Sequence, residues 1–260
     1  MVRLAGQWPT LEPKESTPLH RMLTPADAVS VLNGVLGLTA IFLISLNLLD
    51  LAVLLILFAV LADGLDGFVA RLGYGGGPFG PKLDSFNDFV SFGVAPATLI
   101  FHRYYQWEIV TEVSGPSILT AMAVGAAAGA FLVAGMLRLI RFEVIRGDTR
   151  SDFFTGLSIP AAALWVTLGT YMGWEPRVVL AFTWLAAFLM VSRIKFPKVR
   201  GPLVVPLALA VLGTIWFGRQ FDQSAPRVLF SIMTTYVAMG PLFVRWRAGR
   251  LTDMDHAWAD

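Results

Sequence analysis

Residues 63–88 read DGLDGFVARLGYGGGPFGPKLDSFND. This stretch holds four carboxylates, Asp63, Asp66, Asp84 and Asp88, in a chain that is otherwise strongly apolar. A carboxylate at the centre of a bilayer costs ~2.5–3.5 kcal/mol, so four without partners would cost on the order of 10 kcal/mol. The stretch therefore predicts that something neutralises the acids, and a pair of divalent cations is the simplest candidate.

The composition places the chain among integral membrane proteins. Of its 260 residues, 56% are hydrophobic and 15% are charged, and the mean hydropathy is +0.66. These values are typical of a polytopic membrane protein rather than a water-soluble one. The net charge of +2 indicates no nucleic-acid partner, and we expect none. The absence of cysteine excludes disulfides, a thiol nucleophile and a Cys-ligated metal.

Apolar runs long enough to cross a bilayer recur about eight times along the chain. Backbone groups in lipid must find their partners within the segment, which favours helices. We therefore predict an all-α integral membrane protein, a bundle of about eight transmembrane helices. The predicted spans lie near residues 27–46, 51–71, 83–102, 117–141, 153–172, 177–192, 203–217 and 227–244.

The chain is predicted to have three parts. Residues 1–23 form a loose or interfacial N-terminus without the apolar core of a signal peptide. Residues 24–247 form the transmembrane domain, and residues 248–260 form a cytoplasmic tail.

The distribution of positive charge predicts the orientation. With a cytoplasmic N-terminus, sixteen of the 20 lysines and arginines fall on the cytoplasmic side and four on the other. Such asymmetry follows the positive-inside rule. We therefore expect a multi-pass protein of the cell membrane with both termini in the cytoplasm. The acidic stretch, 63–88, then lies at the cytoplasmic boundary, shared between the second and third helices.

The spacing of the acids indicates a metal site. Asp63 and Asp66 are three residues apart and Asp84 and Asp88 are four apart, so each pair shares one helix face. Carboxylates suit hard cations such as Mg²⁺, and four of them could hold two ions ~3.5–4 Å apart. Acids within a membrane are also compatible with a transporter that binds an ion or a proton. The spacing of the residues between and beside the acids distinguishes a metal site from a transporter site.

Three further residues complete a recognisable pattern. Gly67 and Gly80 leave room for a ligand to approach the backbone, and Arg71 adds a cation near the expected phosphate. Together with the acids they form D-x2-D-G-x2-A-R-x8-G-x3-D-x3-D, running from Asp63 to Asp88. In all eight positions this resembles the signature of the CDP-alcohol phosphotransferase family. The resemblance implies transfer of a phosphoalcohol from a CDP-alcohol to a second alcohol, with release of CMP. It also implies that Gly67, Arg71 and Gly80 bind the CDP-lipid.

The resemblance also implies a role for each acid. Asp63 and Asp84 bridge two divalent ions, Mg²⁺ or Mn²⁺. Asp66 completes the first ion and Asp88 contacts the second. Asp88 is in addition the general base that takes the proton of the acceptor hydroxyl.

Softer patterns outside the signature resemble one branch of the family. They are FVSFGVAPATLI (89–100), LRLIRFEV (137–144), FFTGLSIPAAA (153–163) and RIKFPK (193–198). These resemble the CDP-diacylglycerol–serine O-phosphatidyltransferases and their archaeal relatives that act on CDP-archaeol. The chain departs from this branch at Glu143 and in the loop 145–151. The glycerol-phosphate branch would carry Pro and Lys where this chain has Ser85 and Phe89.

The expected substrates are a CDP-activated lipid and L-serine, and the resemblance implies a homodimer. An inositol phosphate or glycerol phosphate is the alternative acceptor. Arg138 and Arg141, at the cytoplasmic end of the fourth span, either anchor that helix or bind the serine carboxylate. Asp27, Ser30 and Asn33, on one side of the first helix, either line the CDP-lipid site or cap and pack the helix.

Overall fold

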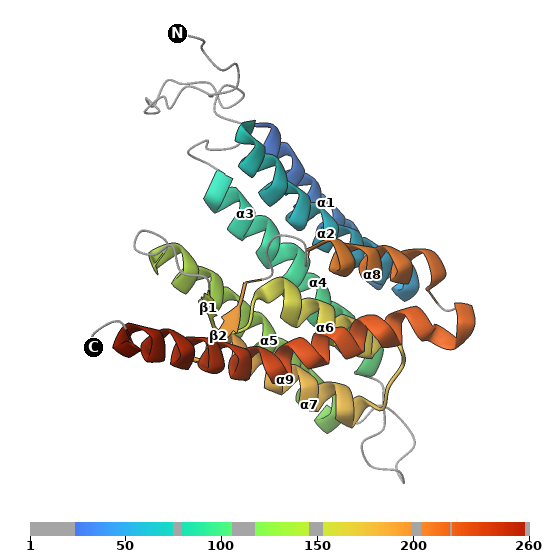
Figure 1. The fold of residues 1–260 in the computed structure, drawn as a ribbon. Helices are drawn as coiled ribbons and strands as arrows, with labels where there is room; N and C mark the ends of the chain where they lie inside the picture. Colours follow the sequence, from blue (N-terminus) through green and yellow to red (C-terminus); the bar gives the residue numbers. More distant parts are fainter. Residues whose placement is uncertain are drawn as a thin grey trace. The chain divides into compact units, whose positions relative to one another are not determined.

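The computed structural model describes residues 24–74, 80–105, 118–145, 153–198, 204–218 and 220–257. Within these ranges the chain is helical apart from one two-stranded ribbon, so the predicted all-α class is confirmed (Figure 1). The elements are α1 (Pro25–Ser45), α2 (Leu49–Val69), η2 (Ala70–Tyr74), α3 (Gly80–Asp88), η3 (Phe89–Val94), α4 (Ala95–Tyr104), α5 (Ile118–Ile145), β1 (Phe153–Thr155), α6 (Ile159–Tyr171), α7 (Pro176–Val191), β2 (Lys195–Pro197), α8 (Val204–Phe217) and α9 (Gln220–Ala257).

Four helices of the described chain are long and apolar enough to cross a membrane: Pro25–Ser45, Leu49–Val69, Ile118–Val144 and Gln223–Trp246. The shorter apolar helices α6, α7 and α8, together with the continuous rod α3–η3–α4, correspond to the other four predicted spans. Membrane association through several apolar helices is thus supported by length and composition. The total of about eight crossings and the cytoplasmic termini stay predictions.

The chain divides into two compact units, and the boundary lies within α5, between Leu132 and Val133. The first unit contains α1 to α4 and the start of α5. The second contains the rest of α5, the ribbon and α6 to α9. The predicted N-terminal part, 1–23, lies outside the described residues, and the predicted domain limits stay predictions.

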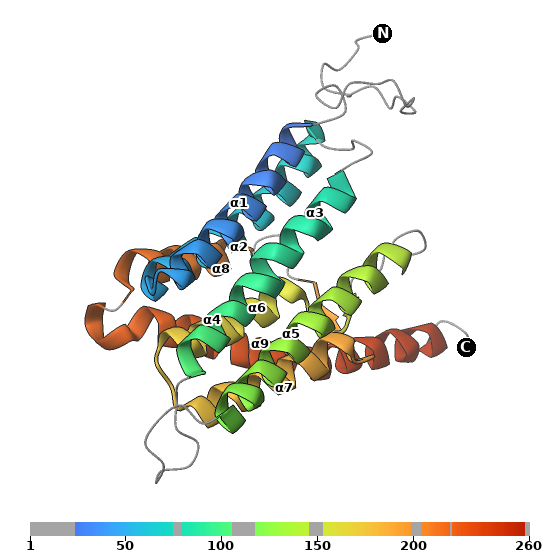
Figure 2. The ribbon, with the colours of Figure 1, turned by 180° about the vertical axis from the view of Figure 1, so that it is seen from behind.

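Close helix packing organises the first unit. Helix α1 packs against both α2 and the rod α3–η3–α4, and the three rods run side by side in both views (Figures 1 and 2). A Cβ at Gly37 would lie 2.5 Å from the Ser91 Cα, and one at Gly34 would overlap the Asn87 side chain. Small residues let helix backbones approach closely in membranes. The rod that carries two of the acids is therefore held directly against α1.

The rod α3–η3–α4 contains a π-helical turn that no local sequence pattern predicted. In η3 the Ala95 amide donates to the Val90 carbonyl, five residues back. Pro96 follows, and proline lacks an amide hydrogen and crowds the preceding turn. Widening the helix relieves that crowding. Such turns are rare and occur frequently at functional sites, and this one begins directly after Asp88.

Aromatic packing joins three helices of the second unit. The Trp165 ring of α6 lies with its centroid 4.9 Å from that of Phe182 on α7. Phe230 on α9 lies 5.7 Å from Phe182 in an edge arrangement. The indole Nε1 of Trp165 donates to the Thr234 Oγ1 at 3.0 Å. The buried polar end of the tryptophan is therefore satisfied while its ring fills the core.

The predicted fifth span begins later than expected, because its first residues form a strand. β1 pairs antiparallel with β2, with Phe154 opposite Phe196. The run Phe-Phe-Thr favours a strand, and Gly156, with φ of 80°, ends it. Pro160 lies in the first turn of α6, where proline is tolerated.

Candidate functional site

Three of the four predicted acids converge in the first unit. Asp63 and Asp66 on α2 and Asp84 on α3 each offer a carboxylate oxygen, and these oxygens lie within 4.8 Å of one another. Asp66 is buried, while Asp63 and Asp84 are partly exposed. Three like charges at this spacing repel one another unless a cation lies among them. Oxygen donors of this kind suit a hard divalent cation, so the cluster can hold one.

The fourth acid, Asp88, lies one helical turn beyond Asp84 and is buried. Its Oδ1 accepts a hydrogen bond of 3.0 Å from the Asn33 amide on α1. Asn33 is fully buried, so this bond forms away from bulk water. The bond fixes the orientation of the Asp88 carboxylate relative to α1. That arrangement suits a carboxylate that must face one direction.

Ser30 supports Asp66 in the same way. Its hydroxyl donates to the Asp66 Oδ2 at 2.7 Å, shorter than its 3.3 Å approach to the Ala26 carbonyl. Ser30 and Asn33 are three residues apart on α1, so a single helix face reaches acids on two different rods. Both residues are thus bonded to the acids themselves, and a contact of Ser30 or Asn33 with the CDP-lipid stays a prediction.

Asp27 caps α1. Its Oδ2 accepts from the Thr24 amide at 2.7 Å, and the Thr24 hydroxyl accepts from the Asp27 amide at 3.3 Å, which is a capping box. Gly80 lies beside it, since a Cβ there would be 2.9 Å from the Asp27 Oδ1. The glycine therefore lets α3 begin next to the start of α1. A CDP-lipid contact by either residue stays a prediction.

Gly67 and Arg71 follow Asp66 along α2 and η2. Gly67 is partly exposed, as a ligand approach would require. The backbone of Arg71 is helical in η2, but its side chain lies outside the described part of the chain. Their predicted roles at the CDP moiety stay predictions.

The structure separates the two arginines of α5, which both belong to the second unit. Arg138 is buried, with its guanidinium carbon 5.7 Å from the Phe142 ring centroid and 5.6 Å from that of Phe154. Arg141 instead directs its guanidinium at backbone carbonyls at the end of α7 and of β1. Their spacing along the sequence had predicted the same role for both arginines.

Two further residues, Ser91 and Phe154, contact the predicted site residues. The Ser91 hydroxyl donates to the Asn33 carbonyl at 2.7 Å, which ties the π-turn to α1. Phe154 lies under both Arg138 and the Lys198 ammonium, the latter 4.9 Å from its ring centroid. Gly34 and Gly37, close to Asn33 in the sequence, could have predicted the close helix approach that brings Ser91 to Asn33. No local sequence pattern predicted the contact of Phe154 with Arg138 and Lys198.

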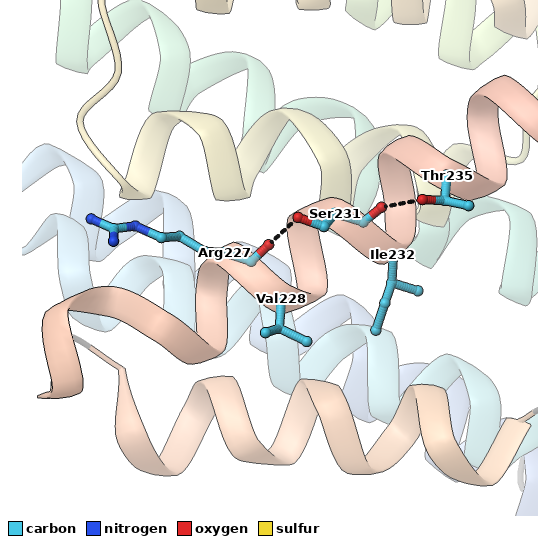
Figure 3. A pocket seen from close by; sticks show the side chains of 5 residues that line it. All are labelled: Arg227, Val228, Ser231, Ile232 and Thr235. Carbon is cyan, nitrogen blue, oxygen red and sulfur yellow. Dashed lines mark hydrogen bonds between the residues drawn. The ribbon is translucent and has the colours of Figure 1, made fainter.

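A shallow groove of about 440 Å³ lies on α9 and involves none of the predicted site residues. The Ser231 hydroxyl donates to the Arg227 carbonyl at 2.8 Å and the Thr235 hydroxyl to the Ser231 carbonyl at 2.8 Å (Figure 3). Their protons are thus used within the helix. The acidic cluster is the better candidate, because three carboxylates with metal-ligating oxygens lie together there.

Replacing Asn33 with Ala tests the support given to Asp88. A hydrogen bond to a charged group contributes about 1.5–3 kcal/mol, so we expect turnover to fall roughly 10- to 100-fold in a folded protein. Thr39→Ala, on an exposed position of the same helix, is the control and leaves turnover unchanged. Wild-type turnover by the Asn33 variant would show that Asp88 needs no such partner.

Comparison with known proteins gives a consistent result. The sequence model of the CDP-alcohol phosphatidyltransferase family matches residues 23–192. The chain is 37% identical over 180 residues to the archaetidylserine synthase of Methanothermobacter thermautotrophicus, covering 67% of this chain and 70% of that protein. It is 33% identical over 205 residues to the CDP-diacylglycerol–serine O-phosphatidyltransferase of Methanocaldococcus jannaschii, covering 75% and 87%. The enzyme of the same name from Helicobacter pylori is 30% identical over 223 residues, covering 81% and 86%.

Proposed function

The chain belongs to the CDP-alcohol phosphatidyltransferase family, and we propose that it transfers a phosphatidyl or archaetidyl group from a CDP-activated lipid to L-serine. The observation that carries this proposal is the clustering of Asp63, Asp66 and Asp84, with Asp88 one turn away on the partner of α1. This clustering supports the proposal that the acids of the signature form one site.

In the proposed reaction the serine hydroxyl oxygen attacks the phosphorus that carries the lipid. The bond from that phosphorus to the CMP oxygen breaks, and CMP leaves with the bonding electrons. Asp88 takes the hydroxyl proton, because an aliphatic hydroxyl is a weak nucleophile at neutral pH. The Asn33 amide, bonded to one Asp88 oxygen, directs the other toward this proton.

The acids would hold two divalent ions, Mg²⁺ or Mn²⁺, with Asp63 and Asp84 shared between them. Bound ions would supply the positive charge that neutralises the pyrophosphate and the departing CMP oxygen. Ser30, which donates to one oxygen of Asp66, keeps that carboxylate oriented. The carboxylate donors fit hard cations rather than soft ones.

Serine is favoured as the acceptor by three observations. The relatives reported above are named as serine or archaetidylserine enzymes. Ser85 and Phe89 stand where the glycerol-phosphate branch carries Pro and Lys. The buried Arg138 offers a guanidinium, which recognises carboxylates bidentately. Inositol phosphate or glycerol phosphate as acceptor is less well supported, and so is an ion-coupled transporter.

The site is proposed to face the cytoplasm, in a multi-pass protein that works as the homodimer implied by its family resemblance. The asymmetry of lysine and arginine along the sequence supports the orientation. A site at that boundary lets a water-soluble amino acid meet a lipid-borne CDP group.

An acceptor panel tests the proposed function. The purified protein with Mg²⁺ or Mn²⁺ is given CDP-diacylglycerol or CDP-archaeol and, in turn, L-serine, inositol phosphate or glycerol phosphate. We expect CMP release with serine only. Release with another acceptor alone would contradict the assignment to serine, and no release with any acceptor would contradict the transferase.

The absence of native cysteine makes the orientation testable. Single cysteines at Gly76 and Gly147 are expected to react with an impermeant reagent only from the cytoplasmic side. A cysteine at Gln106 is expected to react only from outside. All three positions lie outside the described residues. Labelling of Gly76→Cys from outside would reverse the proposed placement of the acidic site.

A further inference from the structure

The guanidinium of Arg141 is occupied by the backbone of the second unit. Its Nη1 donates to the carbonyls of Val191 at 3.1 Å and Ser192 at 3.2 Å. Its Nη2 donates to the carbonyls of Met190 at 3.0 Å and Thr155 at 2.7 Å. Three of these carbonyls belong to the end of α7, where a helix leaves its last carbonyls without internal partners. A cation is favoured at that negative end of the helix dipole.

Gly156 makes room for this arrangement. Its φ is 80°, and a Cβ on it would collide with the Met190 carbonyl and the Arg141 Nη2. The Gly156 amide donates to the Ile194 carbonyl at 2.7 Å and the Leu157 amide to the Leu189 carbonyl at 3.1 Å. The chain leaving β1 is therefore bonded to Leu189 in the last turn of α7 and to Ile194 in the link between α7 and β2.

Strand β1 connects the contacts of Arg141 to those of Arg138. Thr155, whose carbonyl Arg141 holds, follows Phe154, whose ring lies 5.6 Å from the Arg138 guanidinium carbon. Arg138 lies one turn before Arg141 on α5. The carbonyl held by Arg141 therefore lies one residue from the ring that packs against Arg138, in a strand that also pairs with β2.

Using Arg141 as a direct substrate ligand would break this set of bonds. Two of the four bonds are partly buried, and a hydrogen bond from a charged group contributes about 1.5–3 kcal/mol. A substrate carboxylate offers two oxygens to replace four carbonyls, and it would compete with an arrangement already satisfied. The two arginines therefore differ in function although they share one helix face.

We propose that Arg141 is a positioning residue, which clamps β1 and the end of α7 to α5 and so holds Phe154 against Arg138, the residue that meets the acceptor carboxylate. This inference rests on the proposed function, because Arg138 is assigned there to serine. Lysine at 141 would keep the charge but not the planar fork that serves four carbonyls.

The test compares Arg141→Lys with wild type in two measurements on the intact protein. Hydrogen exchange of the segment 153–157 is expected to speed up at least ~10-fold, because the ribbon opens more readily. The KM for serine is expected to rise at least ~5-fold while kcat at saturating serine stays within about 3-fold. Gly156→Ala, which displaces the guanidinium, is expected to reproduce both changes. Arg177→Lys, an exposed position on α7, is the control for both.

Each alternative gives a different result. A raised KM with unchanged exchange in Arg141→Lys would mean that Arg141 contacts serine directly, which overturns the inference. Faster exchange with an unchanged KM would mean that the clamp is structural only, which also overturns it. If the wild type itself uses no serine, the proposed function fails, and this is seen before any variant is compared.

Discussion

Alanine at Asp63 or at Asp84 is expected to abolish CMP release. Each carboxylate belongs to the three-acid cluster and is proposed to serve both metal ions, so neither ion would be held without it. Metal stabilises a protein only by binding its folded state. We therefore expect the rise in melting temperature on adding Mg²⁺ to disappear together with turnover.

Asp50 provides the matched control for this experiment. It is a carboxylate on the same helix as Asp63, exposed and in the first turn of α2. Asp50→Ala is expected to cost at most about 1 kcal/mol of helix-dipole stabilisation and to keep both turnover and the response to Mg²⁺. Near-normal activity of Asp63→Ala at millimolar Mg²⁺ would rule out the shared-ligand role.

Asparagine at Asp88 is expected to slow turnover at least ~100-fold while CDP-lipid still binds with divalent metal. The loss of a general base usually costs ~10²–10⁴ in rate. Asparagine keeps the shape of aspartate and one oxygen that can meet a metal, but it cannot take the hydroxyl proton. CMP release is measured at saturating metal, so that weaker metal binding does not account for the loss.

The bond between Asn33 and Asp88 allows a sharper form of this experiment. Exchanging the two residues, Asn33→Asp with Asp88→Asn, keeps one amide and one carboxylate facing each other. If Asp88 acts as the base, the exchanged protein stays as slow as Asp88→Asn, because the carboxylate now lies on α1. Recovery of turnover by the exchange would show that the pair matters and the position of the carboxylate does not. Near-wild-type release by Asp88→Asn alone would remove Asp88 from the role of base.

The acidic cluster was in large part predictable from the spacing of residues along the sequence. Asp63 with Asp66, and Asp84 with Asp88, share helix faces by periodicity alone, and the glycine-rich link between them requires a reversal of the chain. Convergence of the acids was therefore predictable. That one of them, Asp88, would instead be bonded to Asn33 was not, because the bond joins residues 55 positions apart.

The sequence by itself determined the helical membrane class, the family and the identity of the acids, because hydropathy and helical periodicity are local properties. Tertiary structure alone decided which polar residues of α1 support which acid, and that Arg141 serves carbonyls while Arg138 lies against aromatic rings. It also decided that residues 153–155 form a strand, since β1 needs β2 some forty residues later. In each case the partner is brought by packing between distant segments, which no spacing along one helix encodes.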